Sequence, residues 1–375
     1  MEGDLWSGAG LRHPRLSSSS GAGRALHQAV RYFSKESLAR RTRVKYRGFL
    51  KKYNRFAVAD GLVDEYGRVS VPKPIDVIYF AVWLQLCGNA PTYVRQQLTG
   101  IVSILEANGI PNPTKGADGE MDPRLRRVLR GIKKKCSRAT EKRLPVTTSL
   151  LKRVLQAFDA AHPGMSARDR AGLKSAMSLA VHALLRIGEI TTDTVGAFDA
   201  NKVLLGTDVT IGHDAAGRPR SAKIRITAGK SDVEREGTTI ALHATDLPDC
   251  PVWLLHQYLL VRGPRDATPL YTLGSGCLTR PKFTAALRRT LDALGFDSKL
   301  FSGHSMRGGG AISLACAGHD LATISIYGRW RSLAVLRCLR EMPDSRARSL
   351  QLGMAQIVDG DIQPQHVQVY EDRFG

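Results

Sequence analysis

The stretch that decides the fold of this chain is GHSMRGGGAISLACAGHDLATISIYGRWRSLAVLRCLRE, residues 303–341. It places His304 three residues before Arg307, a spacing that puts two side chains on one face of a helix. An Arg329–Trp330 pair follows, and the stretch ends in a basic segment that contains Cys338. A lone His-x-x-Arg spacing is more typical of an ordinary helix surface than of a functional site. Its meaning therefore depends on the rest of the chain.

The composition indicates a folded and strongly basic protein. Its 375 residues include 55 Lys and Arg against 34 Asp and Glu, which gives a formal net charge of +21, and 43% of them are hydrophobic. This apolar fraction is sufficient for two packed domains. So large an excess of positive charge attracts polyanions. Nucleic acid is the commonest such partner, and acidic membrane lipid is the alternative.

The sequence gives no sign of membrane insertion, export or metal binding. No apolar run reaches the roughly 18 residues that span a bilayer, and the N-terminus lacks the apolar core of a signal peptide. We therefore expect an intracellular protein, located in the nucleus if the host is eukaryotic. Its six cysteines form no Cys-x-x-Cys pair and no Cys/His cluster, which predicts reduced thiols, no metal and no cofactor. They are Cys87, Cys136, Cys250, Cys277, Cys316 and Cys338.

The N-terminal part is predicted to be a tail followed by a helical domain. The Gly- and Ser-rich beginning predicts a disordered tail over residues 1–33. Over residues 34–137, apolar residues recur at three- and four-residue steps, and helices are predicted over residues 75–87, 92–108 and 123–135. Basic side chains fill the remaining faces, so we expect them to contact a phosphate backbone. The candidate DNA-binding residues of this part and of the linker are Arg40, Arg41, Arg43, Lys45, Arg47, Arg95, Lys133, Lys134, Lys135, Arg138 and Arg143.

A basic linker over residues 138–147 leads to a second domain, predicted over residues 148–345, and to a polar tail over residues 346–375. Helices are predicted through residues 172–190, and then three segments rich in β-branched and alternating residues predict a small antiparallel sheet. The strands are expected within residues 202–211, 221–228 and 237–243, and helices are expected over residues 252–261, 280–294, 304–317, 321–327 and 332–340. The fold class is therefore mainly α with a small antiparallel sheet, an α+β arrangement.

Two further motifs of the second domain contain charged residues. In ALLRIGEIT, Arg186 and Glu189 lie one helical step apart within an apolar run that would bury the stem of the arginine. In GKSDVEREGTTI, Lys230 lies at the turn between two predicted strands. Taken singly, an ordinary ion pair and a solvated hairpin lysine account for these residues. Their order along the chain, Arg, hairpin Lys, His-x-x-Arg and Arg-Trp, is what is specific.

This order resembles that of the tyrosine recombinases, the phage-integrase superfamily. The pattern is most similar to the Crypton-like recombinases of eukaryotic mobile elements, which end in GHSxRxGGA, GRW and LRYIRE. The resemblance covers about residues 34–341. It implies a helical core-binding (SAM-like) domain and a catalytic-type domain that close as a clamp around double-stranded DNA. It also implies site-specific recombination in DNA integration, without metal or cofactor, by a homotetramer on two duplexes.

The resemblance also implies a role for each motif residue. Two arginines and a histidine grip the scissile phosphate in this family, and the matching positions are Arg186, Arg307 and His304. Planar guanidinium groups suit this task because each can bind two phosphate oxygens at once. The remaining matched positions are Lys230 as general acid, Glu189 as the acid that holds Arg307 or His304, and Arg329 with Trp330 as phosphate donors. A purely structural role in the core is the alternative for Trp330.

Cys338 stands where this family has its nucleophilic tyrosine. A cysteine sulphur lies roughly 4 Å nearer its own backbone than a tyrosine oxygen, and a misplacement of about 1 Å can already cost a hundredfold in rate. Tyr327 resembles a packing position, and Tyr370 could act only if it were donated to a neighbouring subunit. The interpretation that we prefer is a degenerate or repurposed recombinase in which the tyrosine has become cysteine.

Two other functions remain open at this point. The first is a non-catalytic DNA-binding derivative of a recombinase, which occupies DNA sites without cleaving them. The second is a basic helical protein that binds RNA or a membrane surface. The ordered Arg, Lys and His-x-x-Arg set disfavours the second, because general polyanion binding does not require it.

Overall fold

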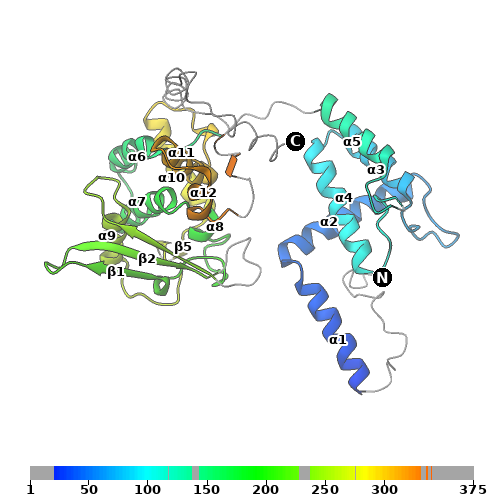
Figure 1. Ribbon diagram of the computed structural model, residues 1–375, viewed down its shortest axis with the longest axis horizontal. Helices are drawn as coiled ribbons and strands as arrows, with labels where there is room; N and C mark the ends of the chain where they lie inside the picture. Colours follow the sequence, from blue (N-terminus) through cyan, green and yellow to red (C-terminus); the bar gives the residue numbers. More distant parts are fainter. Residues whose placement is uncertain are drawn as a thin grey trace, which may run out of the picture. The chain divides into compact units, whose positions relative to one another are not determined.

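The computed structural model describes residues 21–116, 118–136, 143–227, 237–274, 276–330, 335–336 and 339 (Figure 1). The chain divides into two compact units, residues 1–140 and 141–375, and each has its own hydrophobic core. The division falls inside the basic linker that the sequence predicts over residues 138–147.

The first unit is helical throughout most of its described part. Its helices are α1 (Gly21–Glu36), α2 (Arg40–Ala59), α3 (Pro74–Leu86), α4 (Pro91–Ala107) and α5 (Pro123–Cys136). The last three begin at proline, whose fixed φ and missing N–H suit the first helical position. Their bounds lie within one residue of the predicted helices.

Aromatic side chains build the core of the first unit. Tyr53 and Phe56 of α2 pack on Phe80 of α3, with ring centroids 5.2 and 5.3 Å apart respectively, and all three are almost fully buried. Helix α4 approaches α2 closely at Gly100, where a Cβ atom would come within 2.5 Å of the Phe49 ring. Only glycine allows the two helices to pack at this distance.

The N-terminal part of the unit differs from the prediction. Residues 21–33, predicted as disordered tail, belong to α1. Arg43 of α2 ties down the end of this helix, because its guanidinium donates to the Lys35 carbonyl and, at 3.1 Å, to the Glu36 carboxylate. The Ser- and Gly-rich composition concealed a helix whose later residues, from Arg24 on, have good helix propensity.

The second unit combines helices with a small sheet. Its helices are α6 (Thr148–Ala161), α7 (Ala167–His182), α8 (Ile187–Ile190), α9 (Pro251–Arg262), α10 (Arg280–Ala293), α11 (Gly303–Cys316) and α12 (Leu321–Tyr327). Its strands are β1 (Val209–His213), β2 (Pro219–Ile226), β3 (Thr238–His243), β4 (Thr272–Leu273) and β5 (Gly276–Cys277). The predicted fold class, mainly α with a small antiparallel sheet, is confirmed. The helix predicted over residues 332–340 lies largely outside the described residues.

The three longer strands form an antiparallel sheet in the order β1-β2-β3. Ile224 in the central strand is paired with Val209 on one side and Ile240 on the other, and these apolar residues face the core. The first strand begins later than predicted because Gly206–Asp208 form a 3-10 turn before it. The sequence did not predict the ladder of β4 and β5, because two residues per strand are too few for an alternating pattern.

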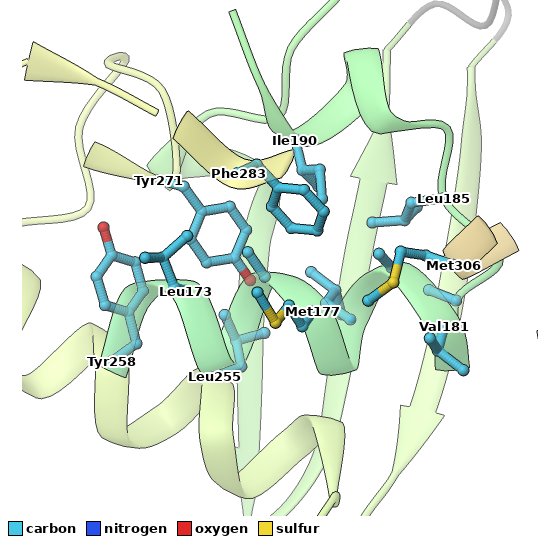
Figure 2. Close-up of a cluster of buried hydrophobic side chains, with 14 of the residues drawn as sticks. Leu173, Met177, Val181, Leu185, Ile190, Leu255, Tyr258, Tyr271, Phe283 and Met306 are labelled. Atoms are coloured by element: carbon cyan, nitrogen blue, oxygen red, sulfur yellow. The ribbon is translucent and has the colours of Figure 1, made fainter. Parts of the chain in front are cut away.

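Helix α7 is the central element of the second unit. It packs against α6, α9 and α11, and α9 also packs against β2 (Figure 1). Figure 2 shows Leu173, Met177 and Val181 along α7 within the buried cluster, with Phe283 of α10 and Met306 of α11 beside them. Burial of so many large apolar side chains fixes α7 firmly, and the segment that follows α7 is anchored with it.

The helix predicted over residues 172–190 is interrupted. α7 ends at His182, Leu184 adopts a left-handed backbone with φ of 46°, and α8 begins at Ile187. This conformation costs a non-glycine residue on the order of 1–2 kcal/mol. The apolar pattern could not reveal the break, because the residues on both sides of it stay buried. Its consequence is that Arg186 precedes α8 instead of lying inside a helix.

Candidate active site of the second unit

The structure brings five of the predicted site residues together. They come from the α7–α8 break, from α8, from α11 and from the turn after α12, and they are Arg186, Glu189, Arg307, Arg329 and Trp330. Segments far apart in the sequence are thereby joined through hydrogen bonds and one stacked pair. The site is built on α7 and α11, both of which are anchored in the core.

The Glu189 carboxylate is the buried acid of the site. Its Oε1 accepts from Nη1 of Arg186 at 3.0 Å, and its Oε2 accepts from the Arg186 backbone N–H at 2.9 Å. The same Oε2 accepts from Nη2 of Arg329 at 3.3 Å. The side chain of Glu189 is only 6% exposed, so its charge depends on these two arginines. The sequence had assigned Glu189 to Arg307 or His304, and that assignment stays a prediction, while the carboxylate also binds Arg186 and Arg329.

Arg307 is buried within the site. Its Nη1 donates to the Leu184 carbonyl at 2.5 Å, and its Nη2 donates to the Gly328 carbonyl. The guanidinium carbon lies 4.1 Å from the centroid of the Trp330 ring, a cation–π contact. Two hydrogen bonds and one cation–π contact therefore fix the plane of this guanidinium.

His304 lies in the first turn of α11, three residues before Arg307, and is exposed. Two glycines after Arg307 let α11 pack closely on its neighbours. A Cβ atom on Gly309 would come within 1.9 Å of the Val146 carbonyl oxygen, and one on Gly310 within 2.3 Å of the Val181 carbonyl oxygen. The Gly-Gly-Gly run of the motif therefore lets α11 seat Arg307 beside the end of α7.

Tyr327 has a structural role in this arrangement. Its hydroxyl donates to the His182 carbonyl at 2.8 Å and so ties the end of α12 to the end of α7. Burial raises the pKa of the Tyr327 hydroxyl. A buried phenol with a raised pKa is a poor nucleophile, in agreement with its prediction as a packing residue.

Three predicted catalytic or nucleophile candidates lie outside the described residues. They are Lys230, Cys338 and Tyr370, and the predicted DNA-binding residue Arg138 is a fourth such position. Within the part of the chain that is described, there is no group of three or more His, Cys, Asp or Glu side chains that could hold a metal ion. Among the same residues, no helix is both long enough and apolar enough to cross a bilayer.

The first unit presents an exposed basic surface on α2 and α5. In α5 the apolar residues Leu125 and Leu129 face the core, and the basic residues point outward. The predicted residues Arg40, Arg41, Lys45, Arg47, Arg95, Lys133, Lys134 and Lys135 are all exposed. Four exposed arginines of α5 were omitted from the predicted set although they lie in the same basic run: Arg124, Arg126, Arg127 and Arg130.

Two predicted DNA-binding residues have other partners. Arg43 is turned towards α1, where its side chain is only 11% exposed. Arg143 is exposed and donates to the Lys299 carbonyl, within the second unit. The basic surface of the first unit therefore excludes Arg43, and Arg143 belongs to the other unit.

Solved structures with a similar fold are those of recombinases. The XerH site-specific recombinase bound to palindromic difH substrate, in a post-cleavage complex, matches with a TM-score of 0.55 at 16% identity, over 92% of this chain and 94% of that one. The pre-cleavage complex of XerH with difH matches with a TM-score of 0.54 at 16% identity, over 92% and 95% of the two chains. No family model and no curated protein matches the sequence. Both units thus match one known architecture, and the chain has the fold of the tyrosine recombinases over most of its length.

Proposed function

We propose that this protein binds double-stranded DNA and grips one phosphodiester in the manner of a tyrosine recombinase, either to carry out site-specific recombination or DNA integration, or to occupy such DNA sites without cleaving them. The observation that carries the proposal is the pair of arginines, Arg186 and Arg307, held in fixed orientations around one buried carboxylate and one turn. Buried charges cost several kcal/mol each unless they are well paired. Charged side chains held in fixed orientations inside a protein are candidates for a functional site.

The proposed reaction is a transesterification at phosphorus. A nucleophile that has released its proton to solvent attacks the phosphorus, the bond to the 5′ oxygen breaks, and that oxygen takes a proton from the general acid, Lys230. One phosphate ester replaces another, so the step needs no nucleotide, and side-chain cations that neutralise the phosphate take the place of a metal. Negative charge grows on the non-bridging oxygens, where Arg186, Arg307 and His304 would stabilise it.

Because Cys338 stands where the similar family has its nucleophilic tyrosine, the proposal takes two forms. In the first, the chain still forms a covalent adduct with DNA, through the Cys338 thiolate or another nucleophile. In the second, which we prefer, it grips the phosphate without cleaving it. The shorter reach of a cysteine favours the second form, because near-attack geometry tolerates little displacement.

The decisive experiment tests covalent capture. Duplexes that bind the full-length protein are first selected from a randomised pool, and each is then nicked next to candidate cleavage positions so that religation is impossible. We expect no adduct on a denaturing gel for the natural chain, and an adduct for Cys338→Tyr. Adduct formation by the natural chain would establish the catalytic form.

A matched control separates chemistry from binding. Cys338→Phe has nearly the size of the tyrosine variant but no hydroxyl, so it should bind the selected duplex without forming an adduct. If Cys338→Tyr also binds duplex DNA tightly and forms no adduct at any nick position, the site does not perform this reaction. The chain would then be a DNA-binding derivative only.

Competition separates the proposal from general polyanion binding. Duplex DNA, double-stranded RNA and anionic vesicles are offered to the protein at equal phosphate concentration. Preference for duplex DNA supports the proposal. Arg186→Gln and Arg307→Gln should lower this preference far less than they lower adduct formation. Equal affinity for the three polyanions would contradict the proposal.

The assembly as a tetramer on two duplexes, the nuclear location and the Crypton-like origin are further proposals, which follow from the sequence resemblance.

A further inference from the structure

The turn Gly328–Trp330 contacts both arginines of the site. The Gly328 carbonyl accepts from Arg307, and the Arg329 carbonyl accepts from Nη2 of Arg186 at a long 3.5 Å. The Trp330 ring stacks under the guanidinium of Arg307. Three consecutive residues therefore each contribute one restraint to a phosphate-binding arginine.

The side chain of Arg329 points into the protein. Its Nη2 donates to the Leu184 carbonyl at 3.0 Å and to the Glu189 carboxylate at 3.3 Å, and its side chain is 12% exposed. Its Nε and Nη1 atoms are buried and have no acceptor among the described residues. A phosphate in solvent therefore has no direct access to these two atoms in this conformation.

Backbone strain marks the same two points. Among the described residues, Leu184 and Arg329 are the non-glycine residues with positive φ, at 46° and 59°. The Arg329 side chain joins them, because it donates to the Leu184 carbonyl. That carbonyl also accepts from Arg307. Such strain persists only where surrounding interactions over-determine the conformation, and it is concentrated at functional sites.

We propose that Arg329 is a positioning residue that orients Arg186 and Arg307 through the turn Gly328–Trp330 and does not itself bind the phosphate. Its side chain binds Leu184 and Glu189 and so holds the turn in place. The turn then fixes the plane of the Arg186 and Arg307 guanidinium groups. This inference deepens the proposed function and rests on it, since it assigns a role within the same site. It replaces the sequence-based assignment of Arg329 as a phosphate donor.

A spectroscopic experiment on the DNA-free protein tests the positioning role. The full-length chain is labelled with 5-fluorotryptophan, which gives one 19F signal for each of its four tryptophans, and Trp330→Phe identifies the signal of Trp330. Arg307→Met defines the signal without the stacked guanidinium. We expect Arg329→Gly to move the Trp330 signal towards that position, although glycine relieves the backbone strain. Arg329→Lys keeps the charge and one donor group, and should move it less.

Arg288 provides the matched control. It donates to the Phe301 carbonyl at 3.0 and 3.2 Å, and so it too is an arginine bonded to a backbone carbonyl, but within the described residues it makes no hydrogen bond to the turn. Arg288→Met should leave the Trp330 signal in place. Unchanged signals from Trp83 and Trp253 show that each variant is folded. If Arg329→Gly does not fold, the partial shift in Arg329→Lys decides the question.

Adduct formation in the Cys338→Tyr background gives the second readout. Arg329→Gly should slow capture of the nicked duplex on the order of a hundredfold, as a misplaced site does, with duplex affinity unchanged within about threefold. Slowed capture with an unmoved Trp330 signal would overturn the inference and make Arg329 a phosphate ligand. If no variant forms an adduct, the proposed reaction fails, and the Trp330 signal still decides whether Arg329 orients Arg307.

Discussion

The two units of this chain hold their positive charge in opposite ways. On α5 the basic side chains are exposed, and the few acids nearby pair only with the first turns of the helix, as Asp122 does with Arg124 at 2.8 Å. In the second unit the cations of the site are few and largely buried, and each is held by named acceptors. The first arrangement suits attraction to any dense array of phosphates. The second suits one phosphate in one orientation.

This difference predicts how each region responds to substitution. Exposed cations are screened by salt and contribute additively, because each acts nearly alone. Buried cations that share an acceptor act as a unit, and removal of one leaves the others uncompensated. Effects in the second unit should therefore be large and insensitive to salt, and effects in the first unit small and strongly salt-dependent.

The largest effect is expected at Glu189. Glu189→Gln removes the buried charge that balances Arg186 and Arg329, and it leaves both guanidinium groups under-compensated. We expect the free energy of unfolding of the second unit to fall by about 3 kcal/mol or more. Hydrogen exchange of peptides from α7 and α11, followed by mass spectrometry in increasing urea, measures this unit separately from the first.

Asp159→Asn is the control for this variant. Asp159 pairs with Lys174 at 2.7 Å on the surface of the same unit, and exposed pairs contribute about 0–1 kcal/mol. If Glu189→Gln lowered the free energy of unfolding no more than Asp159→Asn does, the contrast between buried and exposed charge would be contradicted.

A second large effect is expected at Arg307. Arg307→Lys keeps the charge but loses the planar fork that donates to Leu184 and Gly328 and stacks on Trp330. In the Cys338→Tyr background, adduct formation should fall on the order of a hundredfold or more. Binding of the selected duplex, measured at two salt concentrations, should change less than threefold with the same salt slope. A parallel loss of affinity and rate would mean that Arg307 only contributes general charge.

Much of the fold could be predicted from the sequence, because its helices have strong periodic patterns and proline starts. α3, α4, α5 and α12 were placed to within a residue. The errors have local physical causes. α1 was hidden by a Gly- and Ser-rich beginning, and the break after α7 depends on the left-handed backbone of Leu184, which no apolar pattern encodes.

The order of the motifs predicted several residues that the structure brings together, but it did not predict the hydrogen bonds between them. The motif order identified Arg186, Glu189 and Arg307, and the structure brings these residues together. Which arginine Glu189 holds depends on the rotation of a turn more than a hundred residues away in the chain, and spacing cannot give that rotation. In the structure Arg329 donates to this carboxylate, which supports the positioning role proposed for it.

A smaller effect is expected on the pH dependence of stability, and it concerns the core of the second unit. His162 and His182 belong to the second unit, and burial is the main cause that lowers the pKa of each imidazole below its usual value near 6.5. The unfolded chain then binds more protons than the folded one between the lowered pKa and pH 6.5. Stability of the second unit should be fully present above about pH 6.5 and should fall as the pH drops below it.

The same hydrogen-exchange measurement at pH 7.5, 6.5 and 5.5 tests this decline, after correction for intrinsic exchange rates. His162 lies against Phe158, and its Nε2 is 3.2 Å from the Ala286 carbonyl oxygen, to which it can donate a hydrogen bond. His162→Gln should flatten the pH dependence of the second unit, because glutamine does not titrate. An equal decline in the variant would assign the effect to other groups.

The smallest effect is expected for single lysines of α5. Lys134→Gln removes one exposed cation, so duplex affinity should fall only a few-fold at physiological salt, and the slope of log K against log salt concentration should decrease by about 0.9 if Lys134 contacts a phosphate. Arg124→Gln is the matched control, because it makes the same change in net charge at a side chain already paired with Asp122. A smaller change in slope for Arg124→Gln would identify Lys134 as a phosphate contact. Equal slopes would mean that the first unit acts through its net charge alone, without a defined contact face.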